Sequence, residues 1–155
     1  MVGYRLVRKA RASEAFSGEG ARRYGGRWNP KNIPAVYGSE HLSLAVLEFR
    51  VNQATYDPQD GFVYFLFEFD EALVEAVTEP TKGWRERFSL DGSKTAAQAF
   101  GEDWILKSRS AVLSVPSAVL ETERNFVLNT RHPDFPKIQI GPKLELNLDP
   151  RLWSG

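Results

Sequence analysis

A stretch near the amino terminus combines glycines, arginines and aromatic rings with one later carboxylate. Residues 18–48 read GEGARRYGGRWNPKNIPAVYGSEHLSLAVLE, with four glycines and three arginines in the first ten positions. Glycine allows a ligand to approach the backbone closely, and the planar fork of an arginine such as Arg27 pairs with phosphate oxygens. Glu48 follows in an apolar segment. The pattern predicts a site for a ligand with phosphates and flat rings, where a carboxylate performs chemistry.

Glu48 is expected on a helix of the core. Ser39 is a plausible N-cap for a helix from Glu40 to about Gln53, and this segment is apolar nearly all round. Glu48 has Leu44 four residues before it, Ala45 three residues before it and Val51 three residues after it, so its own face is expected to be apolar. Burying a carboxylate there is costly unless it is paired or put to use. The alternative to a catalytic role is a structural carboxylate bound by an arginine or by backbone N–H groups.

The composition indicates one ordinary globular domain over residues 1–155. The apolar fraction is 42%, and 20 basic residues balance 20 acidic ones, so the total charge shows no nucleic-acid footprint. Residues 1–35 nevertheless hold eight basic and two acidic side chains, while the other 120 hold twelve and eighteen. This asymmetry fits a localised anion site. It also fits a solvated basic surface that pairs with the acidic remainder.

Several classes of chemistry are excluded by what the sequence lacks. Cysteine is absent, which leaves no disulfide, no thiolate nucleophile and no cysteine-ligated metal. The two histidines, His41 and His132, are far apart, so no metal site is expected. No apolar run approaches the roughly 18 residues of a membrane span, and the first residues carry no signal-peptide core. We therefore expect a cytoplasmic protein that does not enter a membrane.

Apolar runs and turn signals predict an α+β fold with a mixed, largely antiparallel sheet and two or three helices. Residues 8–32 look mostly irregular, and a second helix is expected at 93–108 with Ser93 as a possible N-cap. The aromatic run 62–69 is expected to be a central strand. Other strands are predicted at 4–7, 34–38, 111–115 and 125–128, with a weaker one within 71–91 and a hairpin of 138–140 with 144–148 around Gly141-Pro142.

These segments resemble the RES domain, the toxin half of a bacterial toxin–antitoxin family. The matching pieces are YR at Tyr4-Arg5, GEGARRYGGRWN at 18–29, PAVYGSEHLSLAVLE at 34–48 and VPSAVLETERNFVLNTRHPDF at 115–135. One departure is Asn129-Thr130, where the family usually has Asn-Pro. The resemblance implies a fold related to ADP-ribosyltransferases, an activity that consumes NAD⁺, and an Xre-like antitoxin partner.

The resemblance also implies roles for five residues. Arg27 would grip the pyrophosphate of NAD⁺, Arg5 would bind the phosphates or the nicotinamide ribose, and Tyr37 would stack on the nicotinamide ring. Glu48 would bind that ribose and stabilise the cation formed as the glycosidic bond breaks, and Ser117 would position the amide in the nicotinamide pocket. Each role has a structural alternative. Arg27 could be a surface arginine stacked on Trp28, and Arg5 could form an ordinary salt bridge. Tyr37 could be a core residue with a satisfied hydroxyl, and Ser117 a turn or cap serine. A structural role is expected for Asn125, Asn129 and His132.

The function expected from these features is a toxin that cleaves the nicotinamide–ribose bond of NAD⁺ by hydrolysis or phosphorolysis. Mono-ADP-ribosylation of a protein is the alternative at the same site, and a non-catalytic nucleotide-binding module is the alternative from another class. NAD⁺ would be the substrate, with no further cofactor and no direct nucleic-acid binding. The sequence leaves open whether the chain forms a homodimer or a hetero-oligomer with its antitoxin.

Overall fold

The computed structural model describes residues 1–53 and 59–154. In these parts the α-helices are α1 (Glu19–Tyr24), α2 (Leu42–Asn52) and α3 (Ala96–Leu106). The strands are β1 (Val2–Arg8), β2 (Val36–Ser39), β3 (Phe62–Glu68), β4 (Val74–Ala76), β5 (Val112–Pro116), β6 (Arg124–Leu128), β7 (Gln139–Ile140) and β8 (Leu144–Leu146). Short 3-10 turns occupy Lys9–Glu14, Glu71–Leu73, Phe135–Lys137 and Pro150–Trp153.

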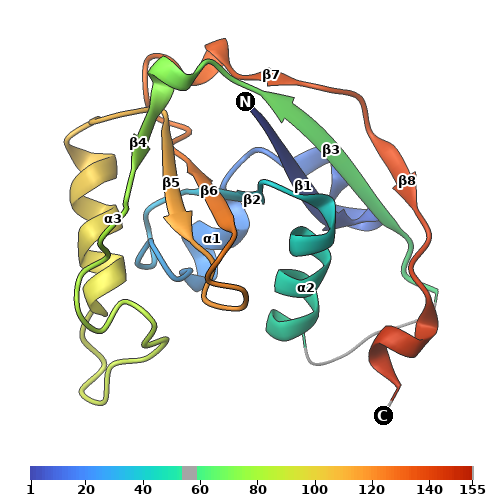
Figure 1. Ribbon diagram of the computed structural model, residues 1–155, viewed down its shortest axis with the longest axis horizontal. Helices are drawn as coiled ribbons and strands as arrows, with labels where there is room; N and C mark the ends of the chain where they lie inside the picture. The colour runs from blue at the N-terminus through green and yellow to red at the C-terminus, as the bar shows by residue number, and fades with distance from the viewer. Residues whose placement is uncertain (54–58, 155) are drawn as a thin grey trace.

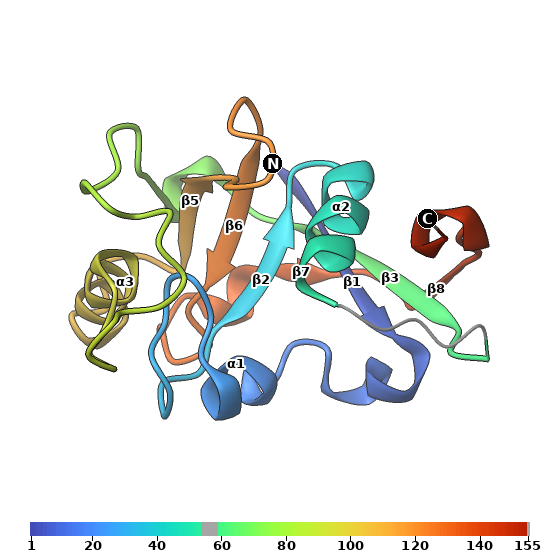
Figure 2. The ribbon, with the colours of Figure 1, turned by 90° about the horizontal axis from the view of Figure 1, so that it is seen from below.

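The described strands form one curled sheet in the order β4-β5-β6-β2-β1-β3-β7, with β8 also paired to β3. The β4–β5 pair is parallel, and the other pairs are antiparallel. The helix α3 covers the end of the sheet formed by β4 and β5, and α2 lies over β1 and β2 (Figures 1 and 2). The predicted α+β class with a largely antiparallel sheet is therefore confirmed.

The long aromatic strand β3 pairs with β1 along its whole length, from Val2 opposite Glu68 to Arg8 opposite Phe62. It lies towards one side of the sheet, with the short β7 and β8 on its outer edge, and so it is not the central strand that its composition suggests. The predicted hairpin is also wrong. Both β7 and β8 run antiparallel to β3, and the N–H of Gly141 between them donates to the Leu66 carbonyl at 2.8 Å. The chain therefore continues along β3 instead of reversing.

The helix α2 differs from its prediction in its start and in its burial. Ser39 belongs to β2, and the N-cap is His41, which makes no side-chain cap hydrogen bond. Only Leu44 and Ala45 are fully buried, whereas the side chains of Leu47 and Val51 are 42% and 55% exposed. Val46 and Phe49 are only partly buried where they pack against the core cluster of Leu6, Ala45 and Phe62. The helix is therefore not buried all round, and the expectation of a core helix is wrong. Apolar composition alone does not show which side of a helix meets a sheet.

Two further local expectations are corrected. The helix α3 begins after Thr95, not Ser93, because Thr95 and Gln98 form a reciprocal capping box that satisfies the first N–H groups. The segment 8–32, expected to be mostly irregular, contains α1 and the 3-10 turn Lys9–Glu14. Gly18 precedes α1 with φ 77° and Gly25 ends it with φ 73°, conformations that glycine adopts without strain. No helix in the described residues has the length and apolar character to cross a bilayer.

The core beneath α3 fixes the position of the loop after α1. Trp28 is 2% exposed and packs with Trp104 and Ile105 of α3 against residues of β5 and β6. Gly101 lies directly on the Trp28 backbone, where an added Cβ would meet the Trp28 carbonyl oxygen at 1.6 Å. The contact allows α3 to hold the backbone next to Arg27, and it requires glycine on the helix.

We expect Gly101→Ala to destabilise the fold by roughly 1–3 kcal/mol or more, the usual cost of overpacking a closed core. The reason is that a backbone carbonyl cannot move aside as a side-chain end does. Urea unfolding would measure the change, with Gly20→Ala in α1 as the matched control, because an added Cβ there meets nothing within 4 Å. Equal midpoints for the two variants would contradict the proposed contact.

Candidate active site

A cavity of about 1320 Å³ opens beside α2, between the loop after α1 and the segment that leads into α3. Arg5, Arg27, Tyr37 and Glu48 all line it, so the fold brings together four of the five residues singled out from the sequence. The lining residues that the structure describes include five cationic side chains and a single carboxylate, that of Glu48. The cationic residues are Arg5, Arg27, Lys31, Arg87 and Lys94.

Glu48 is half-buried on α2 and is held by two neutral donors. Its Oε1 accepts a hydrogen bond from Ser117 Oγ at 2.7 Å and another from Asn125 Nδ2 at 2.6 Å. Both donors are uncharged, so neither described hydrogen bond of Glu48 is part of an ion pair. The expected desolvation on an apolar helix face is thus only partial. Hydrogen bonds from a turn and from a strand satisfy one of the carboxylate oxygens.

Ser117 is fully buried next to Glu48 and does not belong to the described lining of the cavity. Its hydroxyl donates to Glu48 Oε1 and accepts from the backbone N–H groups of Val119 and Leu120 at 3.1 and 3.0 Å. A hydroxyl has one proton and two acceptor positions, so all of its capacity is used. The geometry therefore assigns Ser117 to the support of Glu48 and leaves it no free hydrogen bond for a ligand amide.

The two predicted phosphate-binding arginines are held by backbone carbonyls. Arg5 donates to Ala15 and Tyr37 carbonyl oxygens, each at 2.9 Å, and burial lowers its pKa to about 10, so it remains a cation at neutral pH. Arg27 donates through Nη1 to the Trp84 and Arg85 carbonyls at 3.3 and 2.7 Å. Burial lowers the pKa of Arg27, while the charge of Glu48 opposes that shift. Carbonyl partners leave both positive charges available to an anion.

Tyr37 lines the cavity and also has the satisfied hydroxyl of a core tyrosine, while its stacking on a nicotinamide ring stays a prediction. The hydroxyl donates to Asn29 Oδ1 at 2.6 Å and accepts from the Trp28 N–H at 3.0 Å. Burial raises the pKa of the phenol, so it stays protonated. Asn29 is itself buried and ties the loop together through three carbonyls. Gly26 lies against this pair, where an added Cβ would meet the Tyr37 oxygen at 2.7 Å.

Asn125 is the site residue that sequence reasoning missed. It was expected to be structural, but it lines the cavity and touches the carboxylate. Its position opposite Ser39 on paired strands depends on the register of β2 and β6. A single Asn in a short strand carries no signal of that pairing. Asn129 and His132 contact backbone groups around the ends of α3 and β6, as expected for structural residues.

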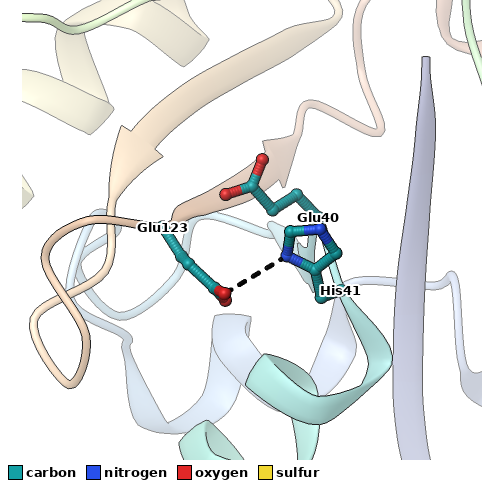
Figure 3. Close-up of side chains that lie close together, drawn as sticks. All are labelled: Glu40, His41 and Glu123. Carbon is teal, nitrogen blue, oxygen red and sulfur yellow. Dashed lines mark ion pairs between the residues drawn. The ribbon is translucent and has the colours of Figure 1, made fainter.

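A second group of polar side chains lies beside the site, at the start of α2. The ligand atoms of Glu40, His41 and Glu123 lie within 4.8 Å of one another, and His41 Nδ1 is 3.4 Å from Glu123 Oε1 (Figure 3). Imidazole nitrogens and carboxylate oxygens are common ligands of divalent metal ions such as Zn²⁺. One Glu40 oxygen, however, already accepts the Arg124 N–H at 2.7 Å. None of the three residues belongs to the described lining of the cavity, and the expectation of no metal site stays a prediction.

Comparison with known proteins places the chain in a family. The sequence profile of the RES domain matches residues 3–149. The chain therefore belongs to the RES domain family, as its motifs predicted.

Its relatives include bacterial toxins. A protein named Toxin Res from Yersinia enterocolitica is 31% identical over 153 residues, which are 98% of this chain and 99% of the relative. A Sphingobium protein named Prs ADP-ribosylating toxin is 30% identical over 152 residues, or 96% and 94%. The Mycobacterium tuberculosis protein named NAD(+) phosphorylase MbcT is 32% identical over 96 residues, which are 59% of this chain and 50% of MbcT.

The crystal structure of the M. tuberculosis MbcT–MbcA toxin–antitoxin complex contains a chain with the same fold. It matches with a TM-score of 0.71 at 24% identity, covering 98% of this chain and 86% of the other. The match confirms the expected fold class, a mixed sheet with few helices.

Proposed function

We propose that this protein is a toxin that cleaves the nicotinamide–ribose bond of NAD⁺, with NAD⁺ as its substrate and no further cofactor. The observation that carries the proposal is the single carboxylate of Glu48, held in a cavity whose other charged side chains are cations. The relatives named as an ADP-ribosylating toxin and an NAD(+) phosphorylase support a reaction at this bond.

The charges of the cavity match those of the substrate. The pyrophosphate of NAD⁺ carries two negative charges, and Arg5 and Arg27 present guanidinium groups whose described partners are carbonyls, not carboxylates. An arginine can pair with phosphate through two parallel hydrogen bonds. The cavity of about 1320 Å³ exceeds the roughly 300–1,000 Å³ of common small-molecule sites, which suits a dinucleotide. The ring of Tyr37 supplies a flat surface for the nicotinamide.

The chemistry needs a negative charge at the nicotinamide ribose. When the C–N bond breaks, its electron pair leaves with neutral nicotinamide, and positive charge develops on the ribose. A fixed anion near that carbon stabilises the transition state more than the ground state. Glu48 supplies this anion, and Ser117 and Asn125 hold it in place. The acceptor atom then bonds to the ribose carbon; water or a protonated side chain releases a proton in this step, and an ionised phosphate oxygen bonds without releasing one.

The acceptor distinguishes three related reactions. Water gives ADP-ribose, inorganic phosphate gives ADP-ribose phosphate, and a protein side chain gives a mono-ADP-ribosylated target. The relative named Prs ADP-ribosylating toxin favours the last, and the relative named NAD(+) phosphorylase favours the second. A binding module without turnover would have no use for a carboxylate among cations, so the position of Glu48 argues against it.

An antitoxin partner follows from the proposed activity. A chain of similar fold occurs in a toxin–antitoxin complex, and a cytoplasmic protein that consumes NAD⁺ would harm its own cell unless it were restrained. We infer an Xre-like antitoxin that covers the cavity, either on one copy of the chain or in a larger hetero-oligomer.

The first test is nicotinamide release by the purified, antitoxin-free protein incubated with NAD⁺. We expect release, and mass analysis of the other product with and without inorganic phosphate identifies the acceptor. A folded protein that releases no nicotinamide in either buffer, and none with cell extract as a source of protein acceptors, would leave only the binding module.

The second test is Glu48→Gln. The amide oxygen of Gln can still accept from Ser117 and Asn125, so we expect stability within about 1 kcal/mol of the unchanged protein. The lost charge should lower turnover by ~10²-fold or more, while NAD⁺ affinity, carried by the arginines and Tyr37, remains. Glu68→Gln, at an exposed carboxylate on β3, is the matched control. Unfolding of Glu48→Gln would make Glu48 a structural residue, and normal turnover would remove it from the chemistry.

The third test concerns the antitoxin. Expression of the chain alone should arrest growth and lower cellular NAD⁺, and co-expression of an Xre-like protein encoded beside it should relieve both effects. The Glu48→Gln variant, expressed at the same level, should not arrest growth. Equal growth with and without the partner, in cells that contain active enzyme, would refute the proposed restraint.

A further inference from the structure

The two oxygens of the Glu48 carboxylate are not equivalent. Oε1 accepts both described hydrogen bonds, from Ser117 at 2.7 Å and from Asn125 at 2.6 Å. Among the hydrogen bonds described for residues 1–53 and 59–154, both that reach this carboxylate end on Oε1 and neither on Oε2. A carboxylate oxygen has two lone pairs, so Oε1 has no free acceptor position. Only Oε2 can accept a hydrogen bond from a ribose hydroxyl or approach a developing cation.

Asn125 has a defined orientation because a second side chain fixes its amide. Ser39 Oγ donates to Asn125 Oδ1 at 2.7 Å, which leaves the Nδ2 end to face Glu48. Ser39 and Asn125 are opposite residues of the antiparallel strands β2 and β6. Ser39 is 3% exposed, so water does not readily replace its hydroxyl. The hydrogen bonds thus run from β2 through β6 to the carboxylate on α2.

We propose that Asn125, oriented by Ser39, is a positioning residue for the NAD⁺ reaction: it occupies Oε1 of Glu48 and leaves Oε2 for the substrate. The proposal rests on the function proposed above and deepens it. It adds Asn125 and Ser39 to the site, and it divides the carboxylate into a held oxygen and a reacting oxygen.

A merely structural role does not account for this geometry. The register of β2 on β6 is already set by four backbone pairs, from Val36 opposite Leu128 to Ser39 opposite Asn125. Backbone hydrogen bonds do not require the Asn125 side chain. A structural asparagine would bind backbone groups, as Asn129 does with the Ile105 carbonyl and the Arg131 N–H. Asn125 instead binds a carboxylate and a hydroxyl at the edge of the cavity.

The decisive variant is Asn125→Asp, which keeps the size of the side chain and exchanges the donor for a second carboxylate next to Glu48 Oε1. Two adjacent carboxylates raise the pKa of the pair. Activity requires the Glu48 anion, so the acid limb of the kcat/KM profile should move to higher pH by about 1 unit or more. Asn147→Asp adds the same charge at an exposed position and should leave the profile unchanged.

The Ser39 step is tested by a double-mutant cycle. Asn125→Ala should lower kcat by ~10-fold or more with KM changed less than about 2-fold, because the interaction acts on the transition state. Ser39→Ala should lower kcat by a smaller factor than Asn125→Ala does. In a protein that already carries Asn125→Ala, adding Ser39→Ala should not lower kcat further, since Ser39 acts only through Asn125. Thermal unfolding midpoints of all variants, measured at the assay pH, show whether a loss of activity is a loss of folding.

A second readout does not depend on turnover. Carboxyl ¹³C NMR of the protein with labelled glutamate follows the titration of Glu48, whose signal is identified by its absence in Glu48→Gln. The midpoint should rise in Asn125→Asp, because that variant places a second carboxylate beside Glu48. An unchanged midpoint in folded Asn125→Asp would overturn the proposal, as would additive losses in the cycle. An enzyme that releases no nicotinamide but shows the shifted midpoint would refute the proposed function and leave the positioning intact.

Discussion

The site depends on two hydrogen bonds to one carboxylate oxygen. Ser117 and Asn125 reach Glu48 from residues 69 and 77 positions away in the chain, and they join α2 to the end of β5 and to β6. The helix alone does not place the carboxylate, because only Leu44 and Ala45 anchor it fully in the core. The orientation of Glu48 is therefore a property of the sheet. It exists only when β6 lies between β5 and β2 in the observed register.

Neutral partners keep opposite charges separate within the cavity. Glu48 is bound by a hydroxyl and an amide, and Arg5 and Arg27 are bound by carbonyls. A direct pair between Glu48 and Arg27 would satisfy both groups, yet it would cancel the anion and the cation that the proposed reaction uses at the ribose and the phosphates. Dipoles that are already oriented hold each charge without cancelling it, which is the arrangement that electrostatic catalysis requires.

The sequence predicted the features that depend on composition and local pattern, whereas the predictions that depend on which strands pair with each other were wrong. Apolar runs located β1, β2, β3, β5 and β6, and the residue types near Arg27 and Glu48 indicated an anion site with a carboxylate. The hairpin of β7 with β8 was wrong because both strands follow β3, a long-range pairing that no local signal encodes. The same limit explains why Asn125 was missed, because Asn125 meets Ser39 only through the β2–β6 register. It also explains why Ser117 was expected in the nicotinamide pocket, whereas the structure shows it buried and hydrogen-bonded to Glu48.

The segment between β4 and α3, residues 77–95, also contacts the residues that support the cavity. Its Trp84 ring stacks on Trp28 with centroids 6.0 Å apart, and its carbonyls bind Arg27. Arg85 reaches across to the Ala118 carbonyl and pairs with Glu121, in the turn that begins at Ser117. This segment therefore contacts the regions that hold both charges of the cavity. A change in its packing would move the Arg27 guanidinium and the support of the Glu48 carboxylate together, and in the proposed reaction it would therefore alter phosphate binding and the position of the anion at once.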